Sequence, residues 1–334
     1  MRSPLSAEAG TARVALVGAS TPLGIELRQA LEERGVPGGR VDLYGTIREE
    51  ATISEYDGEA RLIQQPDVAE VARHDVVFLC ETGPLAARLA VAAEPAAVVI
   101  DLAGALVDPP RPAVVHMDIN PQAAHERRGV LAVPHPLSLL LAELLLPLQE
   151  RLGLTQAVAV VTRPVADFGA GAIEELREQT VGLLSFAEVP TTVLGNKLAF
   201  NVVPQSRIAA ESGDVEARIQ YEVGQLLGWE QGRLAVRLLA VPVFYGHGLQ
   251  VRVALAAGTT AAGVAEALRD VPDLEAPSDD TPATPLEVSG ESRASLAEVA
   301  ADGAGGFWLW LVVGEAAKRS ALQAVRLASA LVAL

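Results

Sequence analysis

A turn near the amino terminus has the residue types that bind a nucleotide phosphate. Gly18-Ala-Ser-Thr-Pro-Leu-Gly24 lies between an apolar run, Arg13 to Ala19, and a segment with helical spacing, Ile25 to Arg34. Glycine lets the backbone approach a pyrophosphate, and a helix N-terminus offers free N–H groups and a positive dipole end. A purely structural strand–turn–helix uses similar small residues. The predicted cofactor-binding residues here are Gly18, Ser20, Thr21, Pro22, Leu23 and Gly24.

The end of the second apolar run, residues 41–46, indicates which dinucleotide is preferred. An acidic residue there would bind the ribose hydroxyls of NAD, but this chain has Thr46 and Arg48. A hydroxyl and a guanidinium suit a 2′-phosphate, so we predict NADP with Thr46 and Arg48 beside it. The alternative for Arg48 is a solvated surface arginine.

His247, which follows Gly246, is the side chain best suited to proton transfer. Imidazole titrates near neutrality, as a general base or acid must. The five histidines show no paired spacing with cysteine or carboxylates, so no metal site is predicted. Cys80 ends an apolar run and is expected to be buried and inert.

The first part of the chain alternates apolar strands with helices, which indicates a parallel sheet covered on both faces. The expected strands are 13–19, 41–46, 76–80 and 97–103, and the expected helices include 25–34 and 84–93. After His135 strands come singly or as neighbours, which indicates a mixed or antiparallel sheet in a second domain. There, residues 237–246 and 248–256 are predicted to pair with each other. The other strands expected in that domain are 156–162, 197–204 and 306–314, and the helices are 137–148, 172–186, 215–227 and 316–334.

Composition excludes several classes of function. The chain has 334 residues, which suits two domains, and a net charge of −16, which disfavours nucleic acid and anionic lipid. The amino terminus lacks the apolar run of a signal peptide, so none is expected, and the apolar stretch 137–148 is too short to span a bilayer. A single cysteine suits a reducing compartment, so a cytoplasmic protein is expected.

Several stretches, in order, resemble the aspartate-semialdehyde dehydrogenase family. They are VALVGASTPLG, VVIDLAGAL, LAVPHPLSLLLAELLLPL, FGAGAIEELREQT, LAFNVVPQ, VPVFYGHGLQVRV and KRSALQAVRLASAL. The resemblance implies a Rossmann-type NAD(P)-binding domain at 12–133, completed by a closing helix in 311–334. It also implies an α+β dimerisation and catalytic-type domain at 134–310, and therefore a homodimer.

Family members reduce an acyl phosphate through a cysteine thioester, and the resemblance maps that cysteine onto Pro136. His247 matches the family's base, and Glu222 matches a substrate-binding glutamate. The substrate arginines fall at Val107 and Ala240, neither of which carries a charge. A nucleophile and cations for the substrate anions are both required, so the thioester reaction is expected to fail.

The remaining family positions also depart from the pattern. His135 stands at the second asparagine before the cysteine, and the glutamine that aids the cysteine falls near Arg163 or Pro164. The lysine that follows the family's substrate glutamate falls at Gln225. An Asp-Asn pair near the C-terminus falls at Gly314 and Glu315. Ser138 is a weak candidate for a substitute nucleophile, because serine needs its own base and oxyanion hole.

These residues predict an NADP-binding homodimer without the family's dehydrogenase activity, a pseudoenzyme. One alternative is an active NADP-dependent semialdehyde dehydrogenase or reductase of amino-acid biosynthesis. Another is an NADP oxidoreductase that acts on a different carbonyl through His247 and forms no thioester.

Overall fold

The computed structural model describes residues 10–45, 53–106, 111–126, 129–209, 213–278 and 280–334. The chain divides into two compact units, one ending at Pro134 and resuming at Ser320, the other running from His135 to Arg319. The chain passes from the first unit to the second after Pro134, one residue after the expected boundary at 133. It returns to the first unit after Arg319, nine residues after the expected boundary at 310. The reason is that the strand Gly306–Val313 belongs to the sheet of the second unit.

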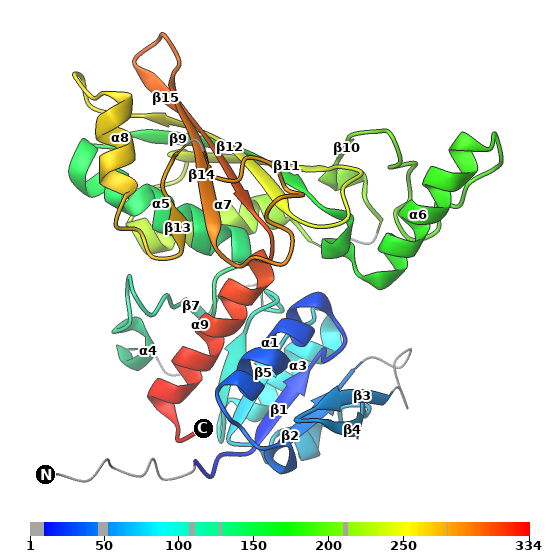
Figure 1. Cartoon of the computed structure of the whole chain (residues 1–334). Coiled ribbons are helices and arrows are strands. Elements are labelled where there is room, and N and C mark those ends of the chain that lie inside the picture. The colour runs from blue at the N-terminus through cyan, green and yellow to red at the C-terminus, as the bar shows by residue number, and fades with distance from the viewer. Residues whose placement is uncertain (1–9, 46–52, 107–110, 127–128, 210–212, 279) are drawn as a thin grey trace, which may run out of the picture. The chain divides into compact units, whose positions relative to one another are not determined.

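The first unit is built on a parallel sheet of six strands in the order β2-β1-β5-β6-β8-β7 (Figure 1). The strands are short and almost entirely buried, which explains why they read as continuous apolar runs. Their bounds are β1 Val14–Val17, β2 Val41–Tyr44, β5 Val76–Leu79, β6 Val98–Asp101, β7 Ala113–Val114 and β8 Leu131–Ala132.

Alternate residues of these strands pack into two separate cores, so both faces of the sheet are covered. Leu16 and Phe78 pack with α1 (Pro22–Glu33) and with the part of α9 (Ala316–Leu331) that follows Ser320. Ala15 and Val77 pack with α3 (Pro84–Ala93) and α2 (Val68–Val71) on the opposite face. Together with the second unit, this confirms the predicted α/β class.

A hairpin that the sequence did not predict follows β2. Its strands, β3 (Ile53–Tyr56) and β4 (Glu59–Leu62), are antiparallel. Tyr56 anchors the hairpin, since its ring is buried and its hydroxyl donates to the carbonyl oxygen of Val36 at 2.9 Å. The short helix α4 (Ala123–Glu126) completes the first unit.

The second unit has a mixed sheet of seven strands in the order β10-β11-β9-β12-β15-β14-β13. The helices of this unit are α5 Pro136–Leu152, α6 Ala170–Leu184, α7 Val215–Leu227 and α8 Ala261–Leu268. The strands are β9 Gln156–Arg163, β10 Val203–Pro204, β11 Leu234–Ala240, β12 His247–Ala254, β13 Leu274–Glu275, β14 Ala294–Ala301 and β15 Gly306–Val313.

The predicted pairing of residues 237–246 with 248–256 is wrong. β9 lies between β11 and β12, pairing in parallel with β11 and antiparallel with β12. The alternating side chains of β9 can pack on either side equally well, so the apolar pattern does not reveal this inserted strand.

One face of this sheet carries the helices and the other does not. Inward residues such as Val161, Val251 and Leu309 pack with α5, α7 and α8. The alternate residues, among them Val160 and Trp308, are only half-buried. Within the described ranges, this second face has no covering layer of helices.

The predicted strand 197–204 is wrong except for its last two residues, which form β10. Gln179 of α6 explains the difference, because its side-chain oxygen accepts the backbone N–H groups of Leu198 at 2.7 Å and Ala199 at 3.1 Å. Phe200 then adopts a left-handed backbone with φ of 57°. A side chain thus takes the hydrogen bonds that a neighbouring strand would supply.

No helix among the described residues is long and apolar enough to cross a membrane.

Candidate functional site

The turn predicted to bind a nucleotide is held together by Thr21. Its side-chain oxygen caps α1 by accepting the N–H of Gly24 at 3.0 Å. The same hydroxyl lies 2.8 Å from the carbonyl oxygen of Gly18 and 3.0 Å from that of Cys80. Thr21 therefore ties the turn to the end of β5.

These contacts occupy N–H groups that a phosphate would otherwise use. The N–H groups of Gly18 and Ala19 both donate to the carbonyl oxygen of Tyr44, at 2.9 and 3.0 Å. Those of Thr21 and Gly24 have protein acceptors as well. Ser20 offers a donor instead, since its buried hydroxyl has no hydrogen-bond partner among the described residues.

Both glycines that bound the turn are required by its geometry. Gly18 has φ of 87°, which favours glycine. A Cβ on Gly24 would lie 2.0 Å from the carbonyl oxygen of Gly18. The glycine pattern therefore has a sufficient structural reason, whether or not a phosphate binds. Pro22 and Leu23 follow as the first residues of α1.

The cofactor-selecting positions Thr46 and Arg48 lie outside the described residues. Tyr44, the last residue of β2, is fully buried, and burial followed by the charge of Asp42 raises the pKa of its phenol. The Tyr44 side chain is therefore part of the core.

His247 belongs to a chain of buried polar groups. Its Nε2 lies 2.9 Å from Oδ2 of Asp167, in the short helix η3 (Val165–Phe168). The same carboxylate oxygen accepts Nε of Arg163 at 2.7 Å. The other side of the Arg163 guanidinium donates to the side-chain oxygen of Gln205 at 2.6 Å. His247, Arg163 and Gln205 each keep only 5% of their surface exposed.

Asp167 is ionised in this arrangement. Burial opposes its charge, but the neighbouring His247 and Arg163 outweigh burial and hold the pKa of Asp167 far below its usual range. Phe168 covers the cluster, with its ring centroid 4.9 Å from the guanidinium carbon of Arg163.

A second cluster surrounds the first residue of α5, which is Pro136. Glu222 of α7 accepts the backbone N–H of His135 at 2.7 Å and the hydroxyl of Ser138 at 2.6 Å through one oxygen. Its other oxygen accepts Nε of Arg218 at 2.6 Å. The Glu222 carboxylate thus ties the N-terminus of α5 to α7 through His135 and Ser138 and pairs with Arg218 within α7. Its predicted role in substrate binding stays a prediction.

Ser138 is poorly placed to act as a nucleophile. It is fully buried, and its hydroxyl proton points to Glu222. Cys80 is equally inert, because burial raises the pKa of its thiol, with Asp101 and Glu81 adding to the effect.

The two clusters are close enough to influence each other electrically. Burial, followed by the charges of Arg218 and Arg163, lowers the pKa of His135 well below its usual value. Nδ1 of His135 accepts the N–H of Leu137 at 3.2 Å. His135 is therefore neutral, with its proton on Nε2.

Packing explains some of the departures from the family pattern. A Cβ on Gly314 would lie 1.8 Å from the carbonyl oxygen of Val288, so an asparagine or aspartate does not fit there without moving that segment. Glu315 donates its N–H to the carbonyl oxygen of Glu291. Ala240 is fully buried at the end of β11, and Val107 lies outside the described residues.

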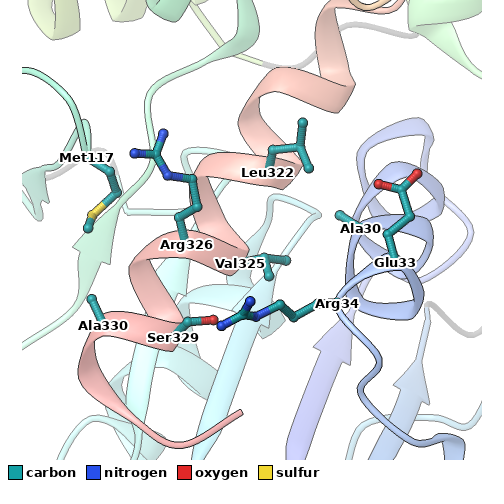
Figure 2. A pocket seen from close by; sticks show the side chains of 9 residues that line it. All are labelled: Ala30, Glu33, Arg34, Met117, Leu322, Val325, Arg326, Ser329 and Ala330. Atoms are coloured by element: carbon teal, nitrogen blue, oxygen red, sulfur yellow. The ribbon is translucent and has the colours of Figure 1, made fainter. Parts of the chain in front are cut away.

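A groove of about 480 Å³ in the first unit lies between α1 and the end of α9 (Figure 2). Its apolar side chains include Met117, Leu322 and Val325, and its arginines are Arg34 and Arg326. It includes none of residues 18–24, so it is separate from the predicted nucleotide turn. No group of metal-binding side chains occurs among the described residues.

Sequence reasoning missed Asp167 and Arg218. Both form ion pairs at a spacing of four residues, Arg163–Asp167 and Arg218–Glu222. Only the pair Arg218–Glu222 lies within a helix, where this spacing was a readable signal. The pairing of Asp167 with His247 spans 80 residues and has no local signal.

Comparisons with known proteins agree on one family. A model of the semialdehyde dehydrogenase NAD binding domain matches residues 13–128, and a model of the semialdehyde dehydrogenase dimerisation domain matches residues 145–314.

Full-length relatives and solved structures are also similar. The aspartate-semialdehyde dehydrogenase of Streptomyces akiyoshiensis is 29% identical over 335 residues, which cover 95% of this chain and 97% of that protein. The USG-1 protein homolog of Azotobacter vinelandii is 28% identical, covering 96% of this chain and 97% of that protein. The crystal structure of aspartate semialdehyde dehydrogenase II from Vibrio cholerae has a TM-score of 0.84 and 25% identity, covering 96% of this chain and 98% of that one.

Proposed function

Because the chain belongs to the semialdehyde dehydrogenase family, we propose that it is an NADP-binding homodimer that does not carry out the family's thioester reaction. The observation that carries this proposal is Pro136, the first residue of α5, at the position where the family resemblance expects the cysteine. Its neighbours support the proposal, since His135 and Ser138 are both engaged by Glu222. An assay for NADPH formation from aspartate semialdehyde and phosphate tests it.

A second candidate is an active NADP-dependent semialdehyde dehydrogenase or reductase. Two observations favour it: His247 is retained, and relatives named as dehydrogenases match over almost the whole chain. A thioester route requires a thiol, and Cys80 is the only one. Turnover that a thiol-blocking reagent abolishes would favour this candidate. Turnover that resists the reagent would favour direct hydride transfer to a different carbonyl.

NADP binding at residues 18–24 is proposed to be weak, for reasons in the turn itself. Four of its N–H groups, those of Gly18, Ala19, Thr21 and Gly24, already have protein acceptors. A pyrophosphate at a helix N-terminus depends on such groups. The Ser20 hydroxyl remains as a donor, and Arg48 supplies the charge for a 2′-phosphate.

Calorimetric titration is expected to show weak NADP binding and still weaker NAD binding. Arg48→Glu should reduce NADP affinity about tenfold or more, since a lost charge-assisted hydrogen bond is worth about 1.5–3 kcal/mol. NAD affinity should change little. Arg34→Glu, at an exposed arginine of the same unit, is the matched control. Equal affinity for both dinucleotides, or equal effects of the two variants, would contradict the assignment.

The homodimer is proposed to form through the uncovered face of the seven-stranded sheet. Val158 and Val160 of β9, Leu239 of β11, and Trp308 and Trp310 of β15 lie half-buried on it. Because β9 is bonded on both sides, this face is continuous across the centre of the sheet. Pairing two such faces would remove these apolar side chains from water, together with Gln250 and Arg252 of β12, which lie between them on the same face. Twofold dimers are the commonest assembly.

Val160→Glu is expected to convert the dimer to a monomer, because it places a charge at the centre of that face. Light scattering at micromolar protein concentration measures the mass directly. Val91→Glu is the control, since Val91 is 68% exposed on α3 of the first unit. A monomeric wild type, or a dimeric Val160→Glu, would contradict the proposed interface.

A further inference from the structure

The groove between α1 and α9 has the size of a site for a small molecule (Figure 2). Its volume of about 480 Å³ falls within the range of roughly 300–1,000 Å³ that such sites have. Both helices pack on the same face of the parallel sheet, with Leu27 and Leu31 of α1 and Ala324 and Leu327 of α9 in one core. The groove therefore lies between two helices that the sheet holds in place.

One side of α9 faces the groove. The side chains that it contributes are spaced three and four residues apart, so they share one face of the helix, and they are Leu322, Val325, Arg326, Ser329 and Ala330. Leu322 is 37% exposed, although the apolar face of a helix that packs on a sheet is usually covered. This face therefore offers apolar surface to a ligand.

Ser329 has an unused hydrogen-bonding group in the groove. Its hydroxyl oxygen is buried and has no hydrogen-bond partner among the described residues. A serine within a helix often donates to the carbonyl four residues earlier, but this hydroxyl does not. A buried hydroxyl without a partner requires an explanation, and a bound polar group would provide one.

Arg34 brings a positive charge to the same groove. It is the exposed C-cap residue of α1 and has no ion-pair partner in the part of the chain that the structure describes. Its side chain extends across the groove toward Ser329 (Figure 2). The other arginine, Arg326, is already held by both carboxylate oxygens of Asp118, at 2.7 and 2.6 Å. Arg34 and Ser329 can therefore both donate to one anionic group.

The charges around the groove favour an anion with a single charge. Glu33 also lines the groove, and the C-terminal ends of α1 and α9 add partial negative charge. Both repel a dianion, such as a phosphate monoester, more strongly than a carboxylate.

We propose that this groove is a second binding site, separate from the nucleotide turn, for a small molecule with a carboxylate head and an apolar tail. Arg34 and Ser329 bind the carboxylate. The tail lies against Leu322, Val325 and Met117, which line the same groove.

Sodium octanoate is the probe, and Met117 reports on its binding. The chain has two methionines, Met1 and Met117. NMR of protein labelled at the methionine methyl carbon therefore gives two signals, and Met117→Leu identifies the one from the groove. Octanoate should shift the Met117 signal saturably and leave the Met1 signal in place. 1-Octanol lacks the charge and propionate lacks most of the tail, so each should bind at least tenfold more weakly.

Variants of the two head-binding residues test the assignment. Arg34→Gln should weaken octanoate binding about tenfold and Ser329→Ala about threefold, because each removes a hydrogen bond to the carboxylate. Arg73→Gln is the matched control, since Arg73 is an exposed arginine of the same unit outside the groove. Its affinity for octanoate should equal that of the wild type.

The outcomes that would overturn the proposal are distinct. Equal binding of octanoate and 1-octanol, or tighter binding of octyl phosphate than of octanoate, would reject the carboxylate head. An unchanged affinity in Arg34→Gln or Ser329→Ala would reject the residues assigned to it. If octanoate does not shift the Met117 signal, the groove is not the site. These measurements require neither NADP nor turnover, so they are independent of the proposed function.

Discussion

The purified protein is expected to form no NADPH from aspartate semialdehyde, NADP and inorganic phosphate. The reaction needs a thiolate, and the position that the resemblance assigns to it is Pro136, whose ring has no nucleophilic atom. The rate should stay below about one-thousandth of that of an active relative, because several transition-state contacts are missing together. The aspartate-semialdehyde dehydrogenase of Streptomyces akiyoshiensis serves as the active control.

Restoring the thiol alone should not restore activity. In Pro136→Cys the substrate would still lack the arginines expected at Val107 and Ala240. Each lost charge-assisted contact costs about 1.5–3 kcal/mol, and a poorly oriented substrate loses rate as well as affinity. Clear turnover by the wild type would contradict the proposal and show that another group performs the attack. Rescue by Pro136→Cys would show that substrate binding is intact.

Glu222→Ala is expected to destabilise the second unit strongly. The carboxylate accepts from His135, Ser138 and Arg218, and only 5% of its side chain is exposed. Removing one partner of a buried ion pair costs about 3–5 kcal/mol, because the remaining charge is left uncompensated. Thermal unfolding should show a fall in Tm of about 10 °C for a unit of this size.

Two further variants separate the causes of that loss. Glu222→Gln keeps an oxygen for hydrogen bonding but removes the charge, so its loss should be smaller. Glu174→Ala is the matched control, because Glu174 forms an exposed i,i+3 pair with Arg177, and such pairs contribute little. Similar Tm values for Glu222→Ala and Glu174→Ala would show that the buried carboxylate of Glu222 contributes no more to stability than an exposed one.

Helices and strands were predicted well where the residues of the element itself carry the apolar pattern. The helix expected at 84–93 has the same bounds as α3, because Pro84 suits the first turn and the apolar spacing is regular. β1, β2, β5 and β6 were recognisable as apolar runs because both of their faces are buried.

Contacts between distant residues account for the errors. The sequence did not show that β9 separates β11 from β12, since its register with them is set by the assembled sheet. Likewise, the apolar residues near Leu198 read as a strand, but the side chain of Gln179 on α6 accepts backbone N–H groups there that a neighbouring strand would accept. The site follows the same rule: His247 was identified, but its partner Asp167, 80 residues earlier, was not.

The central position of β9 also affects how the chain is made. Both neighbours of this strand come much later in the sequence, with Leu234 of β11 paired to Ala157 and Gly248 of β12 paired to Thr162, a separation of 86 residues. During synthesis, β9 therefore leaves the ribosome long before either neighbour exists. Until β11 and β12 are synthesised, the backbone of β9 has no strand to pair with and its apolar side chains stay exposed. Such an exposed strand favours aggregation and chaperone binding. The far edge of β12 is covered only when β15 emerges at residues 306–313, about 50 residues after β12 itself, so the sheet closes late.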